Sequence, residues 1–403
     1  MTESINNKTL LICPSVGIWQ KDGEYYFDQK FYEGMKFYKK YWQGKIKLLI
    51  RIETNSAPDF GLVKYSDNLN DIFETLIIKE NDSFQLIHLQ NVDVVLASAD
   101  DFRQVGFVKL CKVAKVKCIY VLENTIKTRL QIALVSKATI WEKCKSLIWL
   151  VRQELKLRNA LSMADGLQKN GTPGFDIYSK LVTNSLLYFD TRNTDEMLIS
   201  KTLLNSRLDK LDTTAPIRLC FSGRLIAIKG VEDLIEVAHE LHNRKVSFDL
   251  NIFGSGDLDD QLRRKIADYN LQDKVFLHGA VKYETELVPY VKSNVDLFVC
   301  CHKQGDPSCT YLETYACGVP IVGYANEAHK GIVDKEDVGW VTKNGSIKKL
   351  AKEIEYLNNN RHLIKLKSNA ALMFSENHTF EKTFERRIEQ CVEIMNSDRK
   401  IIY

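Results

Sequence analysis

Long apolar runs are missing from the sequence, and none approaches the roughly 20 residues that a membrane-spanning helix needs. The chain opens with MTESINNKTLLICPS, which places no basic stretch before its short apolar segment. Because a secretory signal needs that basic stretch, we interpret the segment as a first strand. These two absences predict a cytoplasmic protein.

Paired cysteines are also missing, although the chain contains ten cysteines, at positions 13, 111, 118, 144, 220, 300, 301, 309, 317 and 391. None of them forms a C-x-x-C pair, and no spacing is typical of a zinc site. Several lie inside apolar runs, where a free thiol packs as a small hydrophobic side chain. We therefore expect neither a disulfide framework nor a structural metal.

Strong charge of one sign is missing as well, because the formal net charge is only +4. No basic stripe or RNA-binding motif accompanies this charge, so we expect no nucleic-acid partner. The 403 residues are 45% hydrophobic and 27% charged, the composition of a soluble globular protein. A chain of this length predicts two domains.

The second half of the chain alternates short apolar segments with amphipathic ones. Strands are predicted at 217–223, 247–256, 274–281, 295–301 and 319–325, and helices at 231–245, 258–270, 284–294 and 309–318. This alternation indicates a parallel sheet that is covered by helices on both faces. A less regular version of the pattern predicts strands in the first half at 9–15, 45–53, 84–89, 92–98 and 116–124.

We therefore predict an α/β protein of two Rossmann-like, doubly wound parallel-sheet domains that face each other across a cleft. The proline in TTAPIR (213–218) places a linker near 200–215, which divides the chain into domains at 1–205 and 206–380. The last helical segment, 381–403, has no sheet partner left. We expect it to pack back on the first domain.

Two stretches that follow strands of the second half are candidates for a ligand site, because loops after parallel strands open at one edge of the sheet. Arg224 and Lys229 follow the strand at 217–223, and two cations beside a helix start form a site for a diphosphate. A solvated loop with ordinary surface charges fits the same pattern. Gly254 and Gly256 form a G-x-G, but a tight turn without a ligand also explains it.

A third candidate stretch is SCTYLETYACG, residues 308–318. Ser308 is a good N-cap residue, so we expect the amides of Cys309, Thr310 and Tyr311 to point out of the helix start toward a phosphate or a sugar oxygen. One turn further, the Glu313 carboxylate could accept hydrogen bonds from the vicinal diol of a ribose. An ion pair within the helix is the alternative for Glu313.

These motifs, in this order and over roughly 216–345, resemble the donor-binding domain of family 4 (group 1) retaining glycosyltransferases of the GT-B fold. The resemblance implies that Arg224 and Lys229 hold the diphosphate of a nucleotide sugar. It also implies that Glu313, which matches the second Glu of the family's E-x7-E element, binds the ribose. The full donor-binding set that it implies is Gly223, Arg224, Lys229, Gly254, Ser308, Cys309, Thr310, Tyr311 and Glu313.

The resemblance implies a hexosyltransferase that moves a sugar with retention from a UDP- or GDP-sugar to a hydroxyl of a growing glycan. The acceptor would be a glycan or a lipid-linked glycan in surface polysaccharide or lipopolysaccharide biosynthesis. No cofactor or metal is obligatory in this family, because cationic side chains stabilise the departing diphosphate. The catalytic residues expected on this basis are Arg224, Lys229, Glu313 and Asp306.

The sequence also departs from the family's pattern. The first Glu of the E-x7-E element falls on Gly305, and the adjacent Asp306 is a candidate substitute. The family's N-terminal His is not evident, since His88 lies inside a predicted strand and is interpreted as a core residue. The candidates for the acceptor side are instead Glu123, Asn124 and Arg129, at the end of the strand at 116–124 and just beyond it.

Two other functions stay open. One is a GT-B nucleotide-sugar epimerase or inverting transferase, for which His302 is the candidate acid–base group. The other is a degenerate GT-B protein that binds nucleotide or glycan without turnover, which the departure at Gly305 would fit. Turnover with a glycan acceptor distinguishes these functions.

Two stretches, 30–45 and 137–156, interleave Lys with Trp, Tyr and aliphatic residues. Such a pattern suits peripheral contact with an anionic membrane surface and a lipid-linked acceptor. The alternative is two amphipathic helices that pack on their own sheet with Lys facing water.

Overall fold

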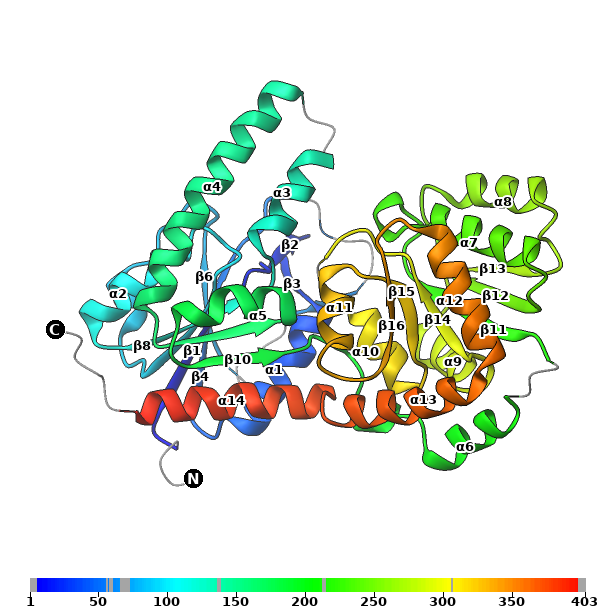
Figure 1. Ribbon diagram of the computed structural model, residues 1–403. Helices are drawn as coiled ribbons and strands as arrows, with labels where there is room; N and C mark the ends of the chain where they lie inside the picture. Colours follow the sequence, from blue (N-terminus) through cyan, green and yellow to red (C-terminus); the bar gives the residue numbers. More distant parts are fainter. Residues whose placement is uncertain are drawn as a thin grey trace. The chain divides into compact units, whose positions relative to one another are not determined.

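The computed structural model describes residues 6–55, 57, 61–65, 73–135, 139–211, 215–305 and 307–397. Contacts between Cα atoms divide the chain into two compact units (Figure 1). Unit 1 comprises Met1–Tyr188 and Glu381–Tyr403, and unit 2 comprises Phe189–Phe380. Each unit contains a parallel sheet, so the predicted α/β fold of two parallel-sheet domains is confirmed.

The main sheet of unit 1 has seven parallel strands in the order β10-β9-β8-β7-β1-β4-β6. The strand order therefore reverses between β1 and β7, where Leu10 pairs with Val94. Both of these strands are buried along their whole length, as expected for the centre of a doubly wound sheet. The strands are β1 (Thr9–Cys13), β4 (Lys45–Arg51), β6 (Glu74–Ile78), β7 (Val94–Ser98), β8 (Lys117–Leu122), β9 (Gly166–Asn170) and β10 (Ser185–Tyr188).

Helices and a small antiparallel sheet complete unit 1. The antiparallel sheet pairs β2 (Trp19–Lys21), β3 (Glu24–Asp28) and β5 (Leu62–Lys64). The helices are α1 (Gln29–Tyr41), α2 (Phe107–Ala114), α3 (Ile126–Val135), α4 (Ile140–Met163), α5 (Thr172–Tyr178) and, from the end of the chain, α14 (Phe380–Asn396).

The C-terminal helix α14 packs within unit 1 through specific contacts. Gln168 on β9 donates from Nε2 to the carbonyl of Arg387 at 2.8 Å and accepts from the Arg387 Nε at 2.8 Å. A Cβ atom at Gly34 of α1 would lie 2.9 Å from the Phe384 ring, so the glycine lets α1 and α14 approach closely. Long-range contacts thus join the end of the chain to its first half.

Two predictions about strands in unit 1 need correction. Residues 84–89 do not form a strand but contain the 3-10 helix η3 (Leu86–Leu89), on which Leu86 is exposed. His88 is accordingly not a strand-interior core residue: it is half-buried, and its Nδ1 accepts from the Gln85 N–H at 3.1 Å. Conversely, one strand that is present was not predicted: β9 is fully buried, although its residues GLQKN are mostly polar.

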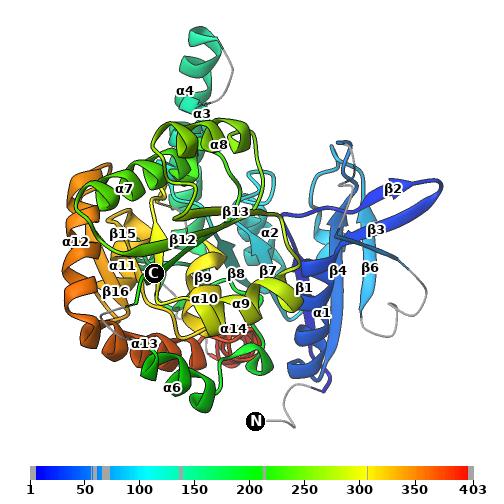
Figure 2. The same cartoon turned by 90° about the vertical axis from the view of Figure 1, so that its right-hand side faces the viewer.

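Unit 2 repeats the doubly wound pattern with six parallel strands in the order β13-β12-β11-β14-β15-β16. The order reverses between β11 and β14, where Leu219 pairs with Leu297. Figure 2 shows these strands with helices around them. The strands are β11 (Ile217–Ser222), β12 (Phe248–Phe253), β13 (Val275–Gly279), β14 (Leu297–Cys300), β15 (Ile321–Tyr324) and β16 (Gly339–Thr342).

The helices predicted at 231–245, 258–270, 284–294 and 309–318 are present in unit 2, and short irregular turns precede two of them. These turns are η6 (Ala227–Lys229) and η7 (Tyr283–Leu287). The helices are α6 (Lys201–Asp209), α7 (Val231–Asn243), α8 (Asp259–Asp268), α9 (Val288–Asn294), α10 (Cys309–Ala316), α11 (Glu327–Val333), α12 (Ile347–Asn359) and α13 (Arg361–Glu376). None of the helices in the described ranges is both long enough and apolar enough to cross a bilayer.

Unit 2 begins at Phe189, earlier than the linker predicted near 200–215 and the boundary predicted at 205. The physical reason is α6, which is not a linker but part of the packed unit. Its Arg207 is buried and donates to the carbonyls of Lys292, Cys317 and Gly318 at 3.0, 2.8 and 2.5 Å. These bonds anchor α6 to the ends of α9 and α10.

Candidate active site

The candidate site in unit 2 lies where β11 and β14 end, at the point where the strand order reverses. Doubly wound sheets bind ligands at this point, because the neighbouring loops diverge to opposite faces there. Arg224 is exposed and Lys229 is half-buried in the loop after β11. Neither side chain has a hydrogen-bond or ion-pair partner among the described residues. The loop therefore presents two cations that an anion could neutralise.

Gly254 allows the loops after β11 and β12 to touch. Its φ is +129°, and a Cβ atom at this position would lie 1.9 Å from the carbonyl oxygen of Gly223. The Gly223 N–H donates to the Phe253 carbonyl at 3.0 Å, which holds the two loops together. The G-x-G therefore has a structural role, since it sets the position of the loop that carries Arg224.

Gly230 brings the end of the same loop against the end of β14. Its φ is +67°, and a Cβ atom there would lie 2.0 Å from the Cys301 carbonyl oxygen. Lys229 is consequently close enough to His302 for its charge to act on the ring. Burial lowers the pKa of His302 well below its usual range, and the positive charge of Lys229 lowers it further. His302 is therefore neutral near pH 7.

His302 belongs to a buried polar cluster beneath the site rather than to its surface. Its Nδ1 lies 3.4 Å from the Tyr311 Oη, and the Asn326 Nδ2 donates to that Oη at 3.1 Å. The Asn326 Oδ1 accepts the His329 N–H at 3.0 Å, and burial lowers the pKa of His329 to about 4. The prediction of His302 as an acid–base group facing a ligand therefore needs correction. The cluster ties the loop after β14 to α10 and α11.

The start of α10 differs from the predicted geometry in two respects. Ser308 occupies the N-cap position, but its side chain accepts no capping hydrogen bond from this described helix. The Tyr311 N–H donates to the Ser308 carbonyl at 3.1 Å, and the Tyr311 side chain is buried, so this amide does not point outward. The roles of the Cys309 and Thr310 amides stay predictions.

Glu313 forms an ion pair at the centre of the site. The Arg192 Nε donates to the Glu313 Oε1 at 2.7 Å; the carboxylate side chain is 10% exposed and the arginine side chain 55%. The guanidinium lies 4.3 Å over the Tyr283 ring, and the Tyr283 hydroxyl donates to the Asn193 Oδ1. Burial by itself lowers the pKa of Arg192, but the negative charge of the Glu313 carboxylate outweighs this effect and raises the pKa. The alternative that Glu313 pairs within its own helix is thus replaced by a partner 121 positions away.

A small cavity adjoins the Glu313 carboxylate. Ser222 at the end of β11, Tyr283, Val288 and Phe298 contribute to its lining. The wall is mostly apolar, with the Glu313 carboxylate as its charged group. Such an arrangement can accept hydrogen bonds from hydroxyl groups of a ligand while apolar side chains contact its flat parts.

Asp306 lies outside the described residues, so its predicted role stays a prediction. The structure places another carboxylate beside its neighbour Gly305. A Cβ atom at Gly305 would lie 2.8 Å from the Glu327 Oε2 and 3.1 Å from the Glu327 Cβ. Glu327 is the first residue of α11, which follows β15 at the same edge of the sheet as β14. A carboxylate therefore lies close to position 305, although that residue is a glycine.

In unit 1, the three predicted acceptor-side residues converge on Asp100, a residue that was not predicted from the sequence. The backbone N–H groups of Glu123 and Asn124 donate to the Asp100 carboxylate at 2.5 and 3.0 Å. The Arg129 guanidinium is buried and lies 3.1 Å from the Asp100 Oδ1. Asp100 follows β7, next to the point where the strand order of this sheet reverses. Glu123, Asn124 and Arg129 thus surround one carboxylate.

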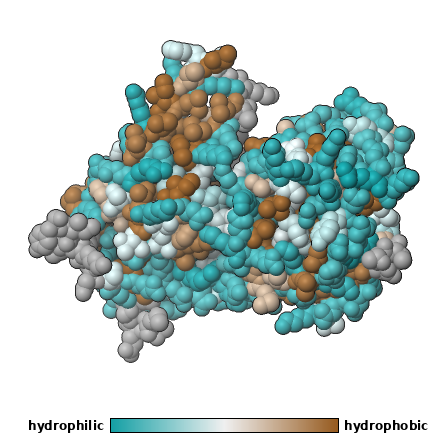
Figure 3. Space-filling view, viewed as in Figure 1, coloured by the Kyte–Doolittle hydropathy of each residue, from teal (hydrophilic) through white to brown (hydrophobic). Residues whose placement is uncertain are grey.

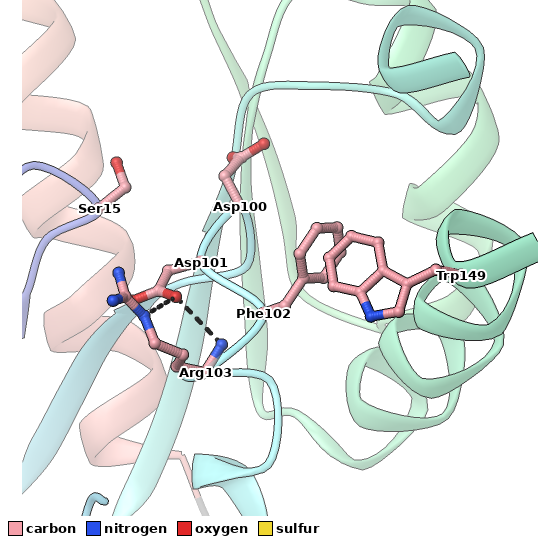
Figure 4. A pocket seen from close by; sticks show the side chains of 6 residues that line it. All are labelled: Ser15, Asp100, Asp101, Phe102, Arg103 and Trp149. Atoms are coloured by element: carbon pink, nitrogen blue, oxygen red, sulfur yellow. Dashed lines mark hydrogen bonds and ion pairs between the residues drawn. The ribbon is translucent and has the colours of Figure 1, made fainter. Parts of the chain in front are cut away.

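A pocket of about 360 Å³ opens at this position (Figure 4). It lies between the loops after β1 and β7 and the helix α4. The Asp101 carboxylate is held by the Arg103 Nε at 2.8 Å, and the Phe102 ring meets Trp149 of α4 edge-on with centroids 4.8 Å apart. The residues that line the pocket are Ser15, Asp100, Asp101, Phe102, Arg103 and Trp149. Carboxylates beside aromatic rings are suited to binding sugar hydroxyls and the apolar face of a sugar ring.

Lys169 is a buried cation near Asp100. Its ammonium donates to the carbonyls of Glu123 and Asn170 at 2.7 and 2.5 Å. Burial lowers the pKa of Lys169 to about 8, although the negative charge of Asp100 acts to raise it. A Cβ atom at Gly174 would lie 1.7 Å from the Lys169 Cε, so the glycine makes room for this side chain. Lys169 was not identified from the sequence, because the strand that carries it is mostly polar and was not predicted.

Two parallel sheets, each with polar groups where its strand order reverses, define a two-domain α/β class of protein. Comparison with solved structures identifies this architecture as the GT-B fold of glycosyltransferases. HepE from Anabaena, crystallised in complex with UDP, matches with a TM-score of 0.63 over 96% of this chain and 99% of its own. At 13% sequence identity this likeness concerns the fold.

Residues 209–375 match the family model of glycosyl transferases group 1, so unit 2 is similar to this family over nearly its whole length. An uncharacterized glycosyltransferase of Haemophilus influenzae is 25% identical over 49% of this chain and 54% of its own. The amylovoran biosynthesis glycosyltransferase AmsK of Erwinia amylovora is 30% identical over 34% of each chain. These matches thus span about half and about a third of the relatives' own length.

Proposed function

We propose that this protein is a glycosyltransferase that transfers a sugar, with retention, from a UDP- or GDP-sugar to a hydroxyl of a growing glycan. The match of residues 209–375 to the glycosyl transferases group 1 supports this proposal, as does the GT-B fold. A role in surface polysaccharide or lipopolysaccharide biosynthesis is supported by the likeness to AmsK. All ten cysteines are free, which favours a cytoplasmic location.

One observation supports the proposal: Arg224 and Lys229 lie in the loop after β11, and Glu313 lies on α10, which follows the neighbouring strand β14. Arg224 and Lys229 would hold the diphosphate, since they lack counter-ions among the described residues. Glu313, oriented by Arg192, would accept hydrogen bonds from the ribose beside the small cavity. In the proposed reaction the bond from the anomeric carbon to the diphosphate breaks and a bond to the acceptor oxygen forms. The acceptor's proton leaves with the diphosphate.

The two cations support a mechanism that needs no metal ion. Arg224 and Lys229 would neutralise the charge that develops on the departing diphosphate, which is the role that a divalent cation takes in other transferases. Transfer activity should therefore persist in EDTA. Activity that disappears in EDTA and returns with a divalent cation would refute this part of the proposal.

The remaining carboxylates have proposed roles on either side of the reaction. Glu327 lies against Gly305, so we assign it the contact with the donor sugar that the E-x7-E element otherwise provides. The pocket around Asp100, Asp101 and Phe102 in unit 1 would bind the glycan acceptor. Both assignments rest on where each group lies within its own unit.

A thermal-shift panel of UDP, GDP, ADP and CMP tests the donor site. A nucleotide at 100 times its dissociation constant stabilises by about 2.7 kcal/mol. For a domain of this size that corresponds to a rise in Tm of about 5–10 °C. We expect UDP or GDP to produce this rise in the wild type and in Glu336→Ala, a control on the exposed surface of unit 2, but not in Glu313→Ala.

The assay also separates the proposed enzyme from a degenerate binding protein. If no nucleotide stabilises the folded protein, the donor-site assignment is wrong. If UDP or GDP binds but no glycan acceptor is ever glycosylated, the protein binds nucleotide without turnover. His302, the acid–base candidate for an epimerase, is buried beneath the site, and this observation favours a transferase over an epimerase.

A further inference from the structure

Helix α4 carries an apolar stripe that no other part of the described chain covers. Its inner face is buried in unit 1 through Leu150, Leu157 and Leu161, as expected for an amphipathic helix. A second row of apolar side chains faces away from that core. Ile140 is 83% exposed and Leu155 is 64% exposed, values that are unusual for large apolar residues in a folded domain.

The second row follows the helical repeat. Its members are separated by four, four, three and four positions, the spacing that aligns side chains on one face of an α-helix. We call this row the outer stripe; it consists of Ile140, Cys144, Ile148, Val151 and Leu155. Single exposed apolar residues need no explanation, whereas a contiguous row of them marks an interaction surface.

Neighbouring side chains widen the outer stripe into a patch. Trp141 and Trp149 of α4 are both exposed, and so are Ile132 and Leu134 of the adjacent helix α3. Figure 3 shows this apolar surface gathered over α3 and α4. Tryptophan combines an apolar ring with an N–H group, and for that reason it concentrates at boundaries between water and lipid.

A row of cations runs along one side of the outer stripe. We call it the basic row; it consists of Lys145, Arg152 and Lys156, all exposed and spaced so that they share one side of α4. The Lys145 ammonium lies 5.2 Å from the centroid of the Trp141 ring. Helix α4 itself contributes two carboxylates, and neither of them belongs to the basic row. Glu142 accepts the Thr139 N–H at the helix start, and Glu154 is buried against Arg158.

We propose that the outer stripe and the basic row form a docking surface for the anionic face of a lipid membrane. Such a surface offers a hydrocarbon boundary for the stripe and phosphate groups for the basic row. A second copy of this chain is a poorer occupant, because it would bring the same cations together. The docking proposal rests on the function proposed above, because an enzyme docked on a membrane would act on an acceptor that is linked to a lipid.

The position of the patch within unit 1 connects it to the candidate acceptor pocket. Trp149 belongs to the patch and also lines the pocket, where its ring meets Phe102. A glycan attached to a membrane lipid would therefore meet the pocket at Trp149, where the patch and the pocket adjoin. Docking at this patch would place the glycan's carrier lipid and the pocket on the same side of unit 1.

Co-sedimentation of the full chain with vesicles tests the proposal. Vesicles of phosphatidylcholine with 30% phosphatidylglycerol are expected to bind the protein, and vesicles of phosphatidylcholine alone are expected to bind it weakly. Ile148→Glu combined with Leu155→Glu should abolish sedimentation. Leu366→Glu combined with Met373→Glu, at exposed apolar positions of α13, is the matched control and should leave it unchanged.

A second pair of variants tests the basic row. Each Lys or Arg near an anionic surface contributes a factor of about five in affinity, so replacing all three by Gln should weaken binding by about 100-fold. The matched control replaces three exposed lysines of unit 2, Lys348, Lys349 and Lys352, by Gln and should retain wild-type binding. Binding that is equally strong to neutral vesicles would contradict the role of the basic row.

Three results would overturn the proposal. The first is a wild-type protein that stays in solution with anionic vesicles. The second is unchanged vesicle binding by the Ile148→Glu, Leu155→Glu variant. The third is a wild-type oligomer in light scattering that this variant converts to monomers, which would assign the stripe to a second copy. Nucleotide stabilisation measured on the same samples shows separately whether the proposed donor site is intact.

Discussion

Replacing Gly254 by alanine tests whether the contact between the loops after β11 and β12 positions the diphosphate-binding cations. The added Cβ atom would lie 1.9 Å from the Gly223 carbonyl oxygen, which is backbone and cannot rotate away. The φ of +129° at Gly254 also disfavours any residue with a side chain. Ordinary van der Waals contact begins at a separation more than about 1 Å longer than this distance. One of the two loops must therefore move by on the order of 1 Å or more to remove the overlap. That movement would carry Arg224 with it.

The expected loss of stability has two parts. A side chain held at a backbone conformation of this kind costs about 1–3 kcal/mol. Overpacking against a neighbouring backbone group costs a further 1–3 kcal/mol, roughly. We therefore expect the free energy of unfolding of unit 2 to fall by about 2–6 kcal/mol.

Gly345→Ala provides a matched control in the same unit. Gly345 has a φ of +70°, but nothing lies within 4 Å of a Cβ atom at this position. The control variant should therefore lose only the stability that the left-handed backbone conformation costs, about 1–2 kcal/mol. Urea denaturation gives both free energies of unfolding, and titration calorimetry gives the dissociation constant of UDP or GDP for each variant.

Nucleotide affinity decides whether the loop contact matters for the proposed site. We expect Gly254→Ala to weaken nucleotide binding by about tenfold or more, equal to about 1.4 kcal/mol, and Gly345→Ala to leave it unchanged. If Gly254→Ala unfolds no more easily than Gly345→Ala and binds nucleotide as the wild type does, the steric reasoning is refuted. If it is destabilised but binds normally, the loop contact does not position Arg224.

Three further predictions concern buried and charged groups of unit 2. Burial holds the pKa of His329 at about 4, below the ordinary 6.5, so the unfolded chain gains a proton first as pH falls. Protonation of His329 on unfolding should lower the wild-type free energy of unfolding by about 2 kcal/mol between pH 7 and pH 5, as measured by urea titrations. The His329→Gln variant should lack this decrease, whereas the control His242→Gln, at an exposed position, should retain it. Arg207→Met leaves several backbone carbonyls without a donor and should cost about 3 kcal/mol or more; an unchanged Tm would contradict the anchoring role of α6. Glu327→Gln should lower kcat in transfer kinetics by about 10- to 100-fold, with little change in the dissociation constant of UDP measured by calorimetry. Glu313→Gln should instead weaken UDP binding in the same calorimetric measurement.

Five strands and four helices of unit 2 could be predicted because local patterns determine them, whereas β16, α6, α11, α12 and α13 were not predicted. Buried parallel strands appear as short apolar runs, and the helices between them show the helical repeat. The same reasoning failed at β9, where Gln168, Lys169 and Asn170 are buried because their polar groups find partners in the fold. It also failed at 84–89, whose apolar residues lie partly on the surface. Apolarity along the chain and burial in the structure are thus related but distinct.

Candidate site residues could be predicted where they directly follow strands, as Arg224 and Lys229 do. Their partners could not, since a hydrogen bond between distant segments leaves no local signal. Arg192 meets Glu313 across 121 positions, and Asp100 gathers the backbone amides of Glu123 and Asn124 from the next strand's end. The strand order explains the second of these meetings, because the loops after the neighbouring parallel strands β7 and β8 open at one edge of the sheet.

The departure at Gly305 shows how such a partner can change the meaning of a missing residue. Along the chain, position 305 lacks the carboxylate that the resemblance calls for. In the structure, the space next to its backbone contains the Glu327 carboxylate, and a Cβ atom at 305 would approach the Glu327 Oε2 to 2.8 Å. A side chain at 305 would therefore require the Glu327 side chain to shift from its present position. The carboxylate that position 305 lacks along the chain is thus present beside it in space, which is the reason for assigning the proposed donor-sugar contact to Glu327.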